Sequence, residues 1–220
     1  MVAIKTLAQQ EIDSCITKEL KPDSEQMSMG EVIDALNKLS GDDAVIVTDV
    51  GQHQMVACRY ARFKRSNSNI TSGGLGTMGF SLPAAIGAKF GAPDRTVVAI
   101  IGDGGFQMTI QELGTIMQSG VDVKILILNN QFLGMVRQWQ ELFHSKRYSF
   151  VDIESPDFVQ VAKGYRINGR RINERIELYE ALNEMLCHKG SYLLEVMVGK
   201  ENNVFPMVEA GTSVSEMRLK

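Results

Sequence analysis

Residues 96–104 read Thr96-Val-Val-Ala-Ile-Ile101-Gly102-Asp103-Gly104, an apolar run that ends in an acidic turn. Residues 123–130 repeat this arrangement, because Val123-Lys-Ile-Leu-Ile-Leu128 leads into Asn129-Asn130. Short apolar runs bounded by turn residues are typical of strands buried in a parallel sheet. The carboxyl ends of such strands meet at one edge of an open α/β sheet, where ligands bind. The two runs therefore predict a sheet with an aspartate and an asparagine at its ligand-binding edge.

Oxygen ligands and glycines occur together at these two strand ends. The Asp103 carboxylate and the Asn130 amide oxygen are ligands of the kind that Mg²⁺ prefers, and we expect the Phe132 carbonyl to point at the same place. Gly104 and Gly105 allow backbone N–H groups to approach a phosphate. The alternative is structural, since aspartate caps helices and paired asparagines are common in turns. The equivalent placement of both residues favours a metal and diphosphate site.

The rest of the chain alternates strands with helices, which predicts a doubly wound, mostly parallel α/β sheet with helices on both faces. We expect residues 1–27 to be a lead-in or linker, residues 28–199 the ligand-binding domain and residues 200–220 a C-terminal tail or flap. The predicted helices begin at the capping box Ser28-Met-Gly-Glu31, near residues 53, 82, 108 and 134, at Ser155-Pro156 and at a cap formed by Asn173. Further strands are predicted at residues 44–48 and 192–198.

The composition excludes several classes of protein. The net charge of −3 argues against nucleic acid as the main partner, and the basic cluster at residues 59–65 is only local. The three cysteines form no CxxC pair, so neither a zinc site nor a disulfide framework is indicated. No apolar stretch approaches the ~18 residues of a membrane span, and no signal-peptide pattern is present. We therefore expect no membrane association and a cytoplasmic location.

Residues 74–79 form a literal GxGxxG string, which raises a second interpretation. In dinucleotide-binding domains this string follows a clear strand and precedes an acidic residue at a later strand end. Only Asn69-Ile-Thr-Ser72 precedes the string here, and Asp94 lies in a proline-containing turn before its strand. The sequence therefore disfavours NAD or FAD binding at this position.

His53 and Trp139 are two further candidates for ligand contact. His53 follows a third predicted strand end, and beside Gln52 it suits contact with a phosphate, although a lone histidine is more often a structural residue. Trp139 shares a predicted helix face with Met135 and Val136. We expect Val136 to pack in the core and Trp139 to border the reaction pocket.

Four ordered blocks of sequence resemble one enzyme family. They are Asp49-Val-Gly-Gln-His-Gln-Met55, Thr71-Ser-Gly-Gly-Leu-Gly-Thr-Met-Gly-Phe80, Gly102-Asp-Gly-Gly-Phe-Gln-Met108 and Leu128-Asn-Asn-Gln-Phe-Leu-Gly-Met-Val-Arg-Gln-Trp-Gln140. Together they resemble acetolactate synthase, also called acetohydroxyacid synthase. The similarity is to the C-terminal diphosphate-binding domain of its large catalytic subunit, and it extends from about residue 27 to residue 207.

The resemblance implies an enzyme that uses thiamine diphosphate and Mg²⁺. Such an enzyme decarboxylates pyruvate and joins the two-carbon unit to a second 2-oxo acid, pyruvate or 2-oxobutyrate, in branched-chain amino acid biosynthesis. The cofactor supplies the carbanion chemistry, while the protein fixes its conformation and surrounding field. The family also implies FAD and a homo-oligomer of at least two subunits, and it allows for a regulatory small subunit.

Carried over by position, the resemblance implies roles for single residues. Asp103, Asn130 and the Phe132 carbonyl would bind Mg²⁺. Gln52 and His53 would contact the diphosphate. The metal and the diphosphate would therefore share one edge of the predicted sheet.

The thiamine end of the cofactor is expected to meet different residues. The backbone of Gly76 and Met78 would contact the aminopyrimidine, and the Met78 side chain would bend the cofactor by wedging under its thiazolium ring. Trp139 would line the acceptor site for the second 2-oxo acid. The implied cofactor contacts are Gln52, His53, Gly76, Thr77, Met78, Asp103, Gly104, Gly105, Asn130, Phe132, Leu133, Gly134 and Met135.

The chain departs from the family pattern at two places. Val56 stands where the family usually has tryptophan, which would change a pocket wall or a subunit contact. Tyr165-Arg-Ile167 replaces a more usual Tyr-Gly turn, which we interpret as peripheral.

The family's activating glutamate lies in an N-terminal domain, and much of its FAD site lies in a middle domain. We therefore expect these residues to carry half a site, to be inactive alone, and to be an expressed C-terminal piece of a longer protein or a naturally split subunit. The alternatives are another thiamine-diphosphate enzyme, such as a pyruvate oxidase or a different carboligase, and a non-catalytic cofactor-binding module.

Overall fold

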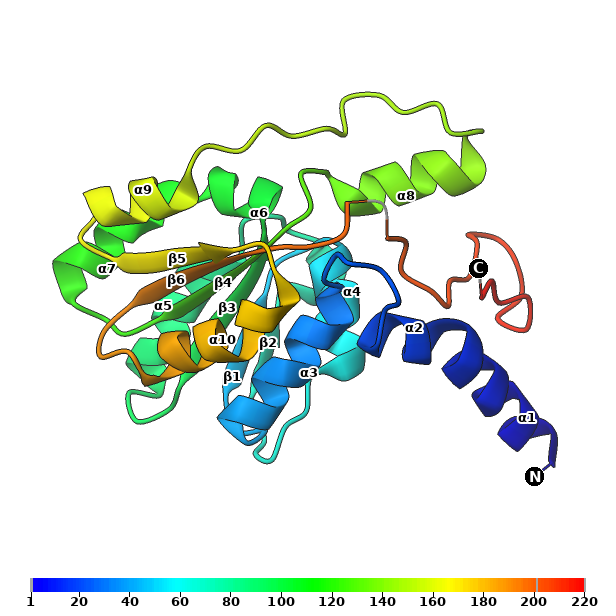
Figure 1. The fold of residues 1–220 in the computed structure, drawn as a ribbon, viewed down its shortest axis with the longest axis horizontal. Helices are drawn as coiled ribbons and strands as arrows, with labels where there is room; N and C mark the ends of the chain where they lie inside the picture. The colour runs from blue at the N-terminus through cyan, green and yellow to red at the C-terminus, as the bar shows by residue number, and fades with distance from the viewer. Residues whose placement is uncertain (1, 201, 220) are drawn as a thin grey trace.

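The computed structural model describes residues 2–200 and 202–219. Within them, six strands form one parallel sheet in the order β2-β1-β3-β4-β6-β5, with helices on both faces (Figure 1). The strands are β1 (Val45–Thr48), β2 (Asn69–Thr71), β3 (Val97–Gly102), β4 (Lys124–Asn129), β5 (Asn168–Ile172) and β6 (Tyr192–Met197). This arrangement confirms the predicted doubly wound α/β fold.

The helices are divided between the two faces of the sheet. One face packs against α3 (Met29–Ser40), α4 (Gln52–Tyr60) and α10 (Leu178–Cys187). The other packs against α5 (Ser81–Gly91), α6 (Asp103–Met108), α7 (Leu113–Ser119) and α9 (Phe158–Gly164). β3 shows why both faces are apolar, since Val98 and Ile100 enter the first cluster while Val97, Ala99 and Ile101 enter the second.

The start of α3 follows from its sequence. The Ser28 side chain accepts a hydrogen bond from Glu31 N, and the Glu31 carboxylate accepts one from Ser28 N, which confirms the predicted capping box. The helix ends at Gly41, which adopts the left-handed conformation with φ 62°.

Three predicted elements differ from the structure. α9 begins at Phe158 with Asp157 as its cap, so the start predicted at Ser155-Pro156 is wrong by two residues. Glu174 rather than Asn173 caps the turn Arg175–Glu177 that leads into α10. The helix predicted near residues 108–118 is instead the 3₁₀ turn Ile110–Glu112 followed by α7, and α6 ends at Met108.

β5 was not predicted. It carries Arg170 and Arg171 and is partly exposed at the edge of the sheet. The arginines find acidic partners, since Arg170 pairs with Glu177 at 2.8 Å and Arg171 with Glu195 at 2.7 Å. An edge strand that pairs its charges in this way lacks the apolar run that marked β3 and β4.

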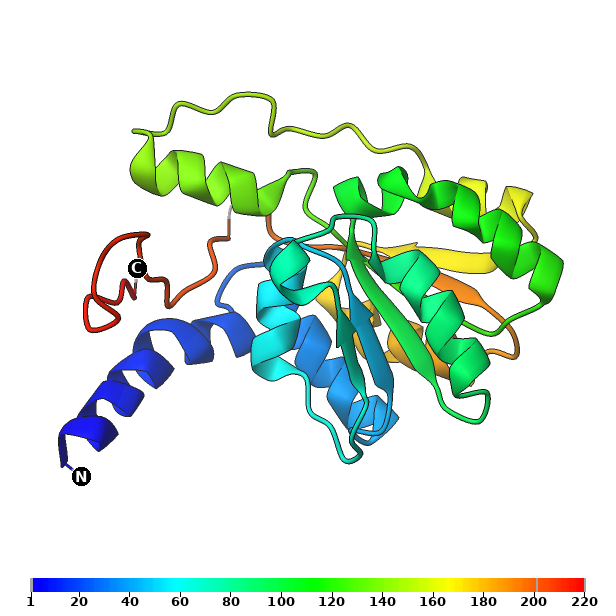
Figure 2. The ribbon, with the colours of Figure 1, turned by 180° about the vertical axis from the view of Figure 1, so that it is seen from behind.

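The N-terminal and C-terminal segments lie at the same end of the molecule as α4 and α8 (Gly134–Phe143), as both ribbon views show (Figures 1 and 2). The N-terminal segment consists of α1 (Val2–Glu11), a π-helical turn (Ile12–Ile16) and α2 (Thr17–Leu20). The Cys15 thiol in this segment donates to the Leu219 carbonyl, and Arg59 of α4 donates to the Phe205 carbonyl. Among the described residues, none of the helices is both long and apolar enough to span a membrane.

We expect Ile100→Ala in the centre of β3 to lower the free energy of unfolding by about 2–5 kcal/mol, because Ile100 is fully buried between strands and helices. Urea unfolding measures this effect. The matched control is Ile176→Ala, where 87% of the side chain is exposed and the change should be within about 0.5 kcal/mol. Equal effects of the two substitutions would contradict the described core.

Candidate functional site

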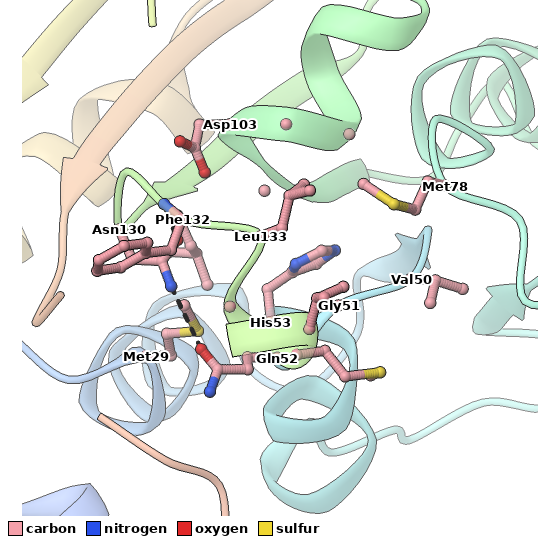
Figure 3. A pocket seen from close by; sticks show the side chains of 17 residues that line it. Met29, Val50, Gly51, Gln52, His53, Met78, Asp103, Asn130, Phe132 and Leu133 are labelled. Atoms are coloured by element: carbon pink, nitrogen blue, oxygen red, sulfur yellow. Dashed lines mark hydrogen bonds between the residues drawn. The ribbon is translucent and has the colours of Figure 1, made fainter. Parts of the chain in front are cut away.

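A cavity opens at the carboxyl edge of the sheet, where β1, β3 and β4 end (Figure 3). The chain leaves β1 toward β2 on one side and then crosses to β3 on the other side of β1. Ligands bind in the crevice that such a reversal creates. Its lining comes from residues 50–53, Met78, residues 102–105, Asn130 and residues 132–136, together with Met29 and Leu128.

Asp103 is the first residue of α6 and lies in the wall of this cavity with 1% of its surface exposed. Burial raises the pKa of its carboxyl group to about 6, while backbone N–H groups of Asp103 and Gly104 and the Ser155 hydroxyl act in the opposite direction. Ser155 Oγ donates to Asp103 Oδ2 at 3.3 Å. A buried carboxylate that burial destabilises in this way is a good ligand for a cation.

The turn after β4 places the second predicted metal ligand at the same edge. Asn130 is 4% exposed, and its Oδ1 accepts a hydrogen bond from Phe132 N at 3.2 Å. Its Nδ2 donates to Gln52 Oε1 at 3.2 Å, which fixes the amide so that Oδ1 stays on the side of the turn (Figure 3). Gln131 has a φ of +57°, which produces the sharp change of direction after the strand.

The two asparagines of this turn serve different purposes. Asn129 Nδ2 donates to the buried Glu195 carboxylate at 2.7 Å, and its Oδ1 accepts from Gln131 N at 3.0 Å. Arg171 compensates the charge of Glu195 at 2.7 Å. Asn129 therefore ties the turn to β6, whereas Asn130 lines the cavity.

Gln52 and His53 form the start of α4 and are both 4% exposed. Gln52 Nε2 donates to Gln138 Oε1 at 2.9 Å and to the Asn202 carbonyl at 3.0 Å. His53 Nε2 lies 2.5 Å from Asp49 Oδ1. Asp49 is fully buried and was not among the predicted site residues, although it stands four positions before His53 in the first sequence block.

Glycines allow the segments around the cavity to approach one another. A Cβ on Gly134 would lie 2.2 Å from Gln52 Oε1 and 2.7 Å from Asn130 Nδ2. A Cβ on Gly104 would lie 2.8 Å from Ile153 Cδ1 and 3.0 Å from Leu133 Cδ2. These distances are shorter than ordinary contacts, so a side chain at either position would displace the neighbouring side chains that line the cavity.

The structure brings together most of the predicted site residues, and it separates some of them. The residues that line the cavity are Gln52, His53, Met78, Asp103, Gly104, Gly105, Asn130, Phe132, Leu133, Gly134 and Met135. Gly76 and Thr77 lie in the exposed loop before Met78 and do not line it.

Trp139 lies outside the cavity. It lines a shallow surface groove with Val136, Gln140, His144 and Arg147, and its ring centroid is 4.7 Å from that of Phe143. Val136 is 45% exposed and borders both the groove and the cavity, so the prediction that it packs in the core is wrong. The two hollows meet at this side chain.

The donor atoms at the cavity fit a hard cation. In the described part of the chain, no group of three or more His, Cys, Asp and Glu residues is placed to hold a metal. The donors that converge here are instead the Asp103 carboxylate and the Asn130 amide, beside the backbone of Phe132. Mg²⁺ is usually bound by one or two protein oxygens and completes its shell with phosphate and water.

Comparison with known proteins agrees with this geometry. Residues 49–196 match the family described as "Thiamine pyrophosphate enzyme, C-terminal TPP binding domain". The chain belongs to this family. The match begins at Asp49, directly after β1, and includes the ends of β3 and β4 at the cavity, so this family's cofactor-binding domain is the domain described above.

The most similar relatives within the family confirm the resemblance inferred from the four sequence blocks. "Acetolactate synthase isozyme 2 large subunit" of Escherichia coli (strain K12) is 49% identical over 179 residues, which cover 81% of this chain and 33% of the relative. "Acetolactate synthase large subunit" of Lactococcus lactis is 41% identical over 216 residues, which cover 97% of this chain and 37% of the relative. The chain thus spans about a third of the length of these relatives.

A solved structure of a thiamine diphosphate-dependent enzyme superimposes on the fold. It is a Rhodococcus jostii RHA1 thiamine diphosphate-dependent 4-hydroxybenzoylformate decarboxylase with a TM-score of 0.75 and 26% sequence identity. The superposition covers 81% of this chain and 34% of that chain. The α/β thiamine-diphosphate-binding fold is therefore shown by structure as well as by sequence.

Asp103 should make the stability of the metal-free chain depend on pH. Because burial raises its pKa from 3.8 to about 6, the native state binds more protons than the unfolded state between these values, and stability falls as pH rises through this window. The decrease in the free energy of unfolding that Asp103 causes over this window is up to about 3 kcal/mol, and Asp103→Asn should abolish it. Urea unfolding from pH 4 to 8 in the presence of a chelator measures it.

The exposed Asp94→Asn is the matched control for this change, and its pH profile should follow that of the unaltered chain. Parallel profiles for Asp103→Asn and the unaltered chain would contradict the role assigned to burial.

We expect Gly134→Ala to destabilise the chain by about 1–3 kcal/mol, because its Cβ collides with Gln52 and Asn130. Thermal unfolding measures the effect. Gly87→Ala is the control, since Gly87 lies within α5 with no atom within 4 Å of the added Cβ. That substitution should stabilise by about 0.5–1 kcal/mol, and a similar loss at both glycines would refute the close approach at Gly134.

Proposed function

We propose that this chain is the cofactor-binding C-terminal part of an acetolactate synthase large subunit. The observation that carries the proposal is the meeting of Asp103, Asn130 and Phe132 at one cavity on the carboxyl edge of the sheet. The relatives named acetolactate synthase, at 41–49% identity, support the choice of this enzyme within the family. The decarboxylase structure, at 26% identity, supports only the wider class.

The residues at the carboxyl edge have distinct tasks in this proposal. Asp103 and Asn130 would hold Mg²⁺ through side-chain oxygens, and Phe132 through its carbonyl. The N-terminus of α6 would direct the Gly104 and Gly105 N–H groups at the diphosphate. The positive end of this helix and the cation would together neutralise the diphosphate charge.

The other walls of the cavity would hold the organic part of the cofactor. Thiamine diphosphate supplies the carbanion that attacks the 2-oxo acid. Met78, Leu133 and Met135 form an apolar wall that would exclude water from the ring system. Trp139 would border the acceptor acid from the groove that meets the cavity at Val136.

The substrates we propose are pyruvate and a second 2-oxo acid, pyruvate or 2-oxobutyrate, in branched-chain amino acid biosynthesis. Since the chain spans about a third of its relatives, the rest of the site would come from other segments. FAD, a homo-oligomer of at least two subunits, a regulatory small subunit and a cytoplasmic location are further parts of the proposal, carried over from the family resemblance.

Calorimetric titration of thiamine diphosphate into this chain tests the proposal. With Mg²⁺ present we expect binding, and with a chelator we expect its loss. Asp103→Ala should weaken the metal-dependent binding by at least about tenfold, because it removes a charged ligand of the cation. Asp94→Asn should leave the affinity unchanged.

Two results would contradict the proposal. One is metal-independent binding that Asp103→Ala leaves intact. The other is a folded chain that fails to bind even after the N-terminal domain of a relative has been added, since that addition supplies the rest of the cofactor site.

A further inference from the structure

Asp49 is a completely buried carboxylate at the carboxyl end of β1, and each of its oxygens contacts a different segment of the cavity wall. Oδ1 lies 2.5 Å from His53 Nε2 at the start of α4. Oδ2 accepts a hydrogen bond from Gly79 N at 2.8 Å. A buried carboxylate is costly unless such partners compensate it.

The contact with His53 fixes the ring. An ionised carboxylate only accepts hydrogen bonds, so His53 Nε2 carries the hydrogen, and Nδ1 is the nitrogen left for other partners. This edge of the ring faces the end of β3, where a Cβ on Gly102 would lie 3.1 Å from Nδ1. Figure 3 shows the ring among the side chains that line the cavity, which include Leu133 and Met78.

The contact with Gly79 holds a second segment in place, the loop that carries Met78 and Gly79. Gly79 has a φ of +78°, and its carbonyl accepts a hydrogen bond from Thr109 Oγ1 at 2.9 Å. The peptide groups on both sides of Gly79 are therefore held, one by Asp49 through the Gly79 N–H and the other by Thr109 through the Gly79 carbonyl. Met78, whose side chain lines the cavity, immediately precedes it.

The start of α6 leaves room for Asp49. A Cβ on Gly105 would lie 2.0 Å from Asp49 Oδ2, so the helix that begins with Asp103 packs directly on this carboxylate. One side chain thus contacts the segments that carry His53, Met78 and Asp103. These segments are far apart in the sequence and meet at Asp49.

We propose that Asp49 is a positioning residue that holds the His53 ring and the Met78–Gly79 loop in the arrangement that the cofactor cavity requires. The inference rests on the proposed function for the nature of the ligand, a diphosphate bound through Mg²⁺. Asp49 acts through His53 and Gly79 and does not itself line the cavity.

The first test reads the His53 tautomer by two-bond ¹H–¹⁵N correlation spectra of the cofactor-free chain. The chain has three histidines, and the spectrum of His53→Gln identifies the signal of His53. We expect a ring protonated at Nε2 in the unaltered chain. In Asp49→Asn the side-chain amide can donate to Nε2 and still accept from Gly79, so the hydrogen should move to Nδ1.

The second test measures affinity for thiamine diphosphate with Mg²⁺ in a double-mutant cycle. Asp49→Asn should weaken binding by about tenfold or more in the unaltered background, as expected for loss of a hydrogen bond to a charged group. In the His53→Gln background the same change should cost less than about threefold, because its target is gone. A merely structural role would give equal losses in both backgrounds.

Asp94→Asn is the matched control and should change neither the spectra nor the affinity. An unchanged His53 tautomer in a folded Asp49→Asn chain would overturn the inference, as would equal losses in the two backgrounds. Failure of the unaltered chain to bind the cofactor, even with the N-terminal domain added, would count against the proposed function instead. The tautomer measurement uses no cofactor and still decides the role of Asp49 in that case.

Discussion

The parallel register of β1, β3 and β4 is the constraint on which the cavity depends. Thr48 pairs with Ile100 and Gly102 pairs with Leu128. Asp49 therefore leaves the sheet at the level of Ile101, two positions before Asp103, while Asn130 follows the end of the next strand, β4. Adjacent strands are about 4.8 Å apart. The register of the strands is therefore enough to bring these polar residues to the same edge of the sheet. A shift of register by one residue would also invert every side chain between the two faces.

The buried faces of the sheet explain why the polar groups stand at its ends. β3 and β4 contribute apolar side chains to both helix layers, so a polar side chain within them would need a buried partner. Glu195 in β6 is such a case, and it is satisfied by Asn129 and Arg171. The same pairs anchor the turn that carries Asn130, so the compensation of one buried charge also supports the cavity.

The sequence was informative where a local pattern determines structure. The continuous apolar runs predicted β3 and β4, and the polar residues after them predicted the cavity, because strand ends and ligand sites coincide in this class of fold.

β5 was missed because its arginines are compensated by acidic residues from α10, from the 3₁₀ turn before α10 and from β6. Ser155 was predicted to start a helix and instead contacts Asp103, a contact across 52 positions that no local pattern encodes. The core position predicted for Val136 was wrong for a related reason, since this side chain is 45% exposed and borders the cavity and the groove.

Gln52 has a consequence that extends beyond the cavity. Its amide oxygen accepts from Asn130, while its amide nitrogen donates to the Asn202 carbonyl and to Gln138, which in turn binds Val204 at both of its amide atoms. The turn after β4 and the segment that follows β6 are thus joined by one continuous set of amide groups. All of these groups are neutral, so the connection does not vary with pH and is not screened by salt. A ligand that orders the turn after β4 therefore also favours order in the segment after β6. Ordering of that segment favours the ordered turn by the same coupling free energy.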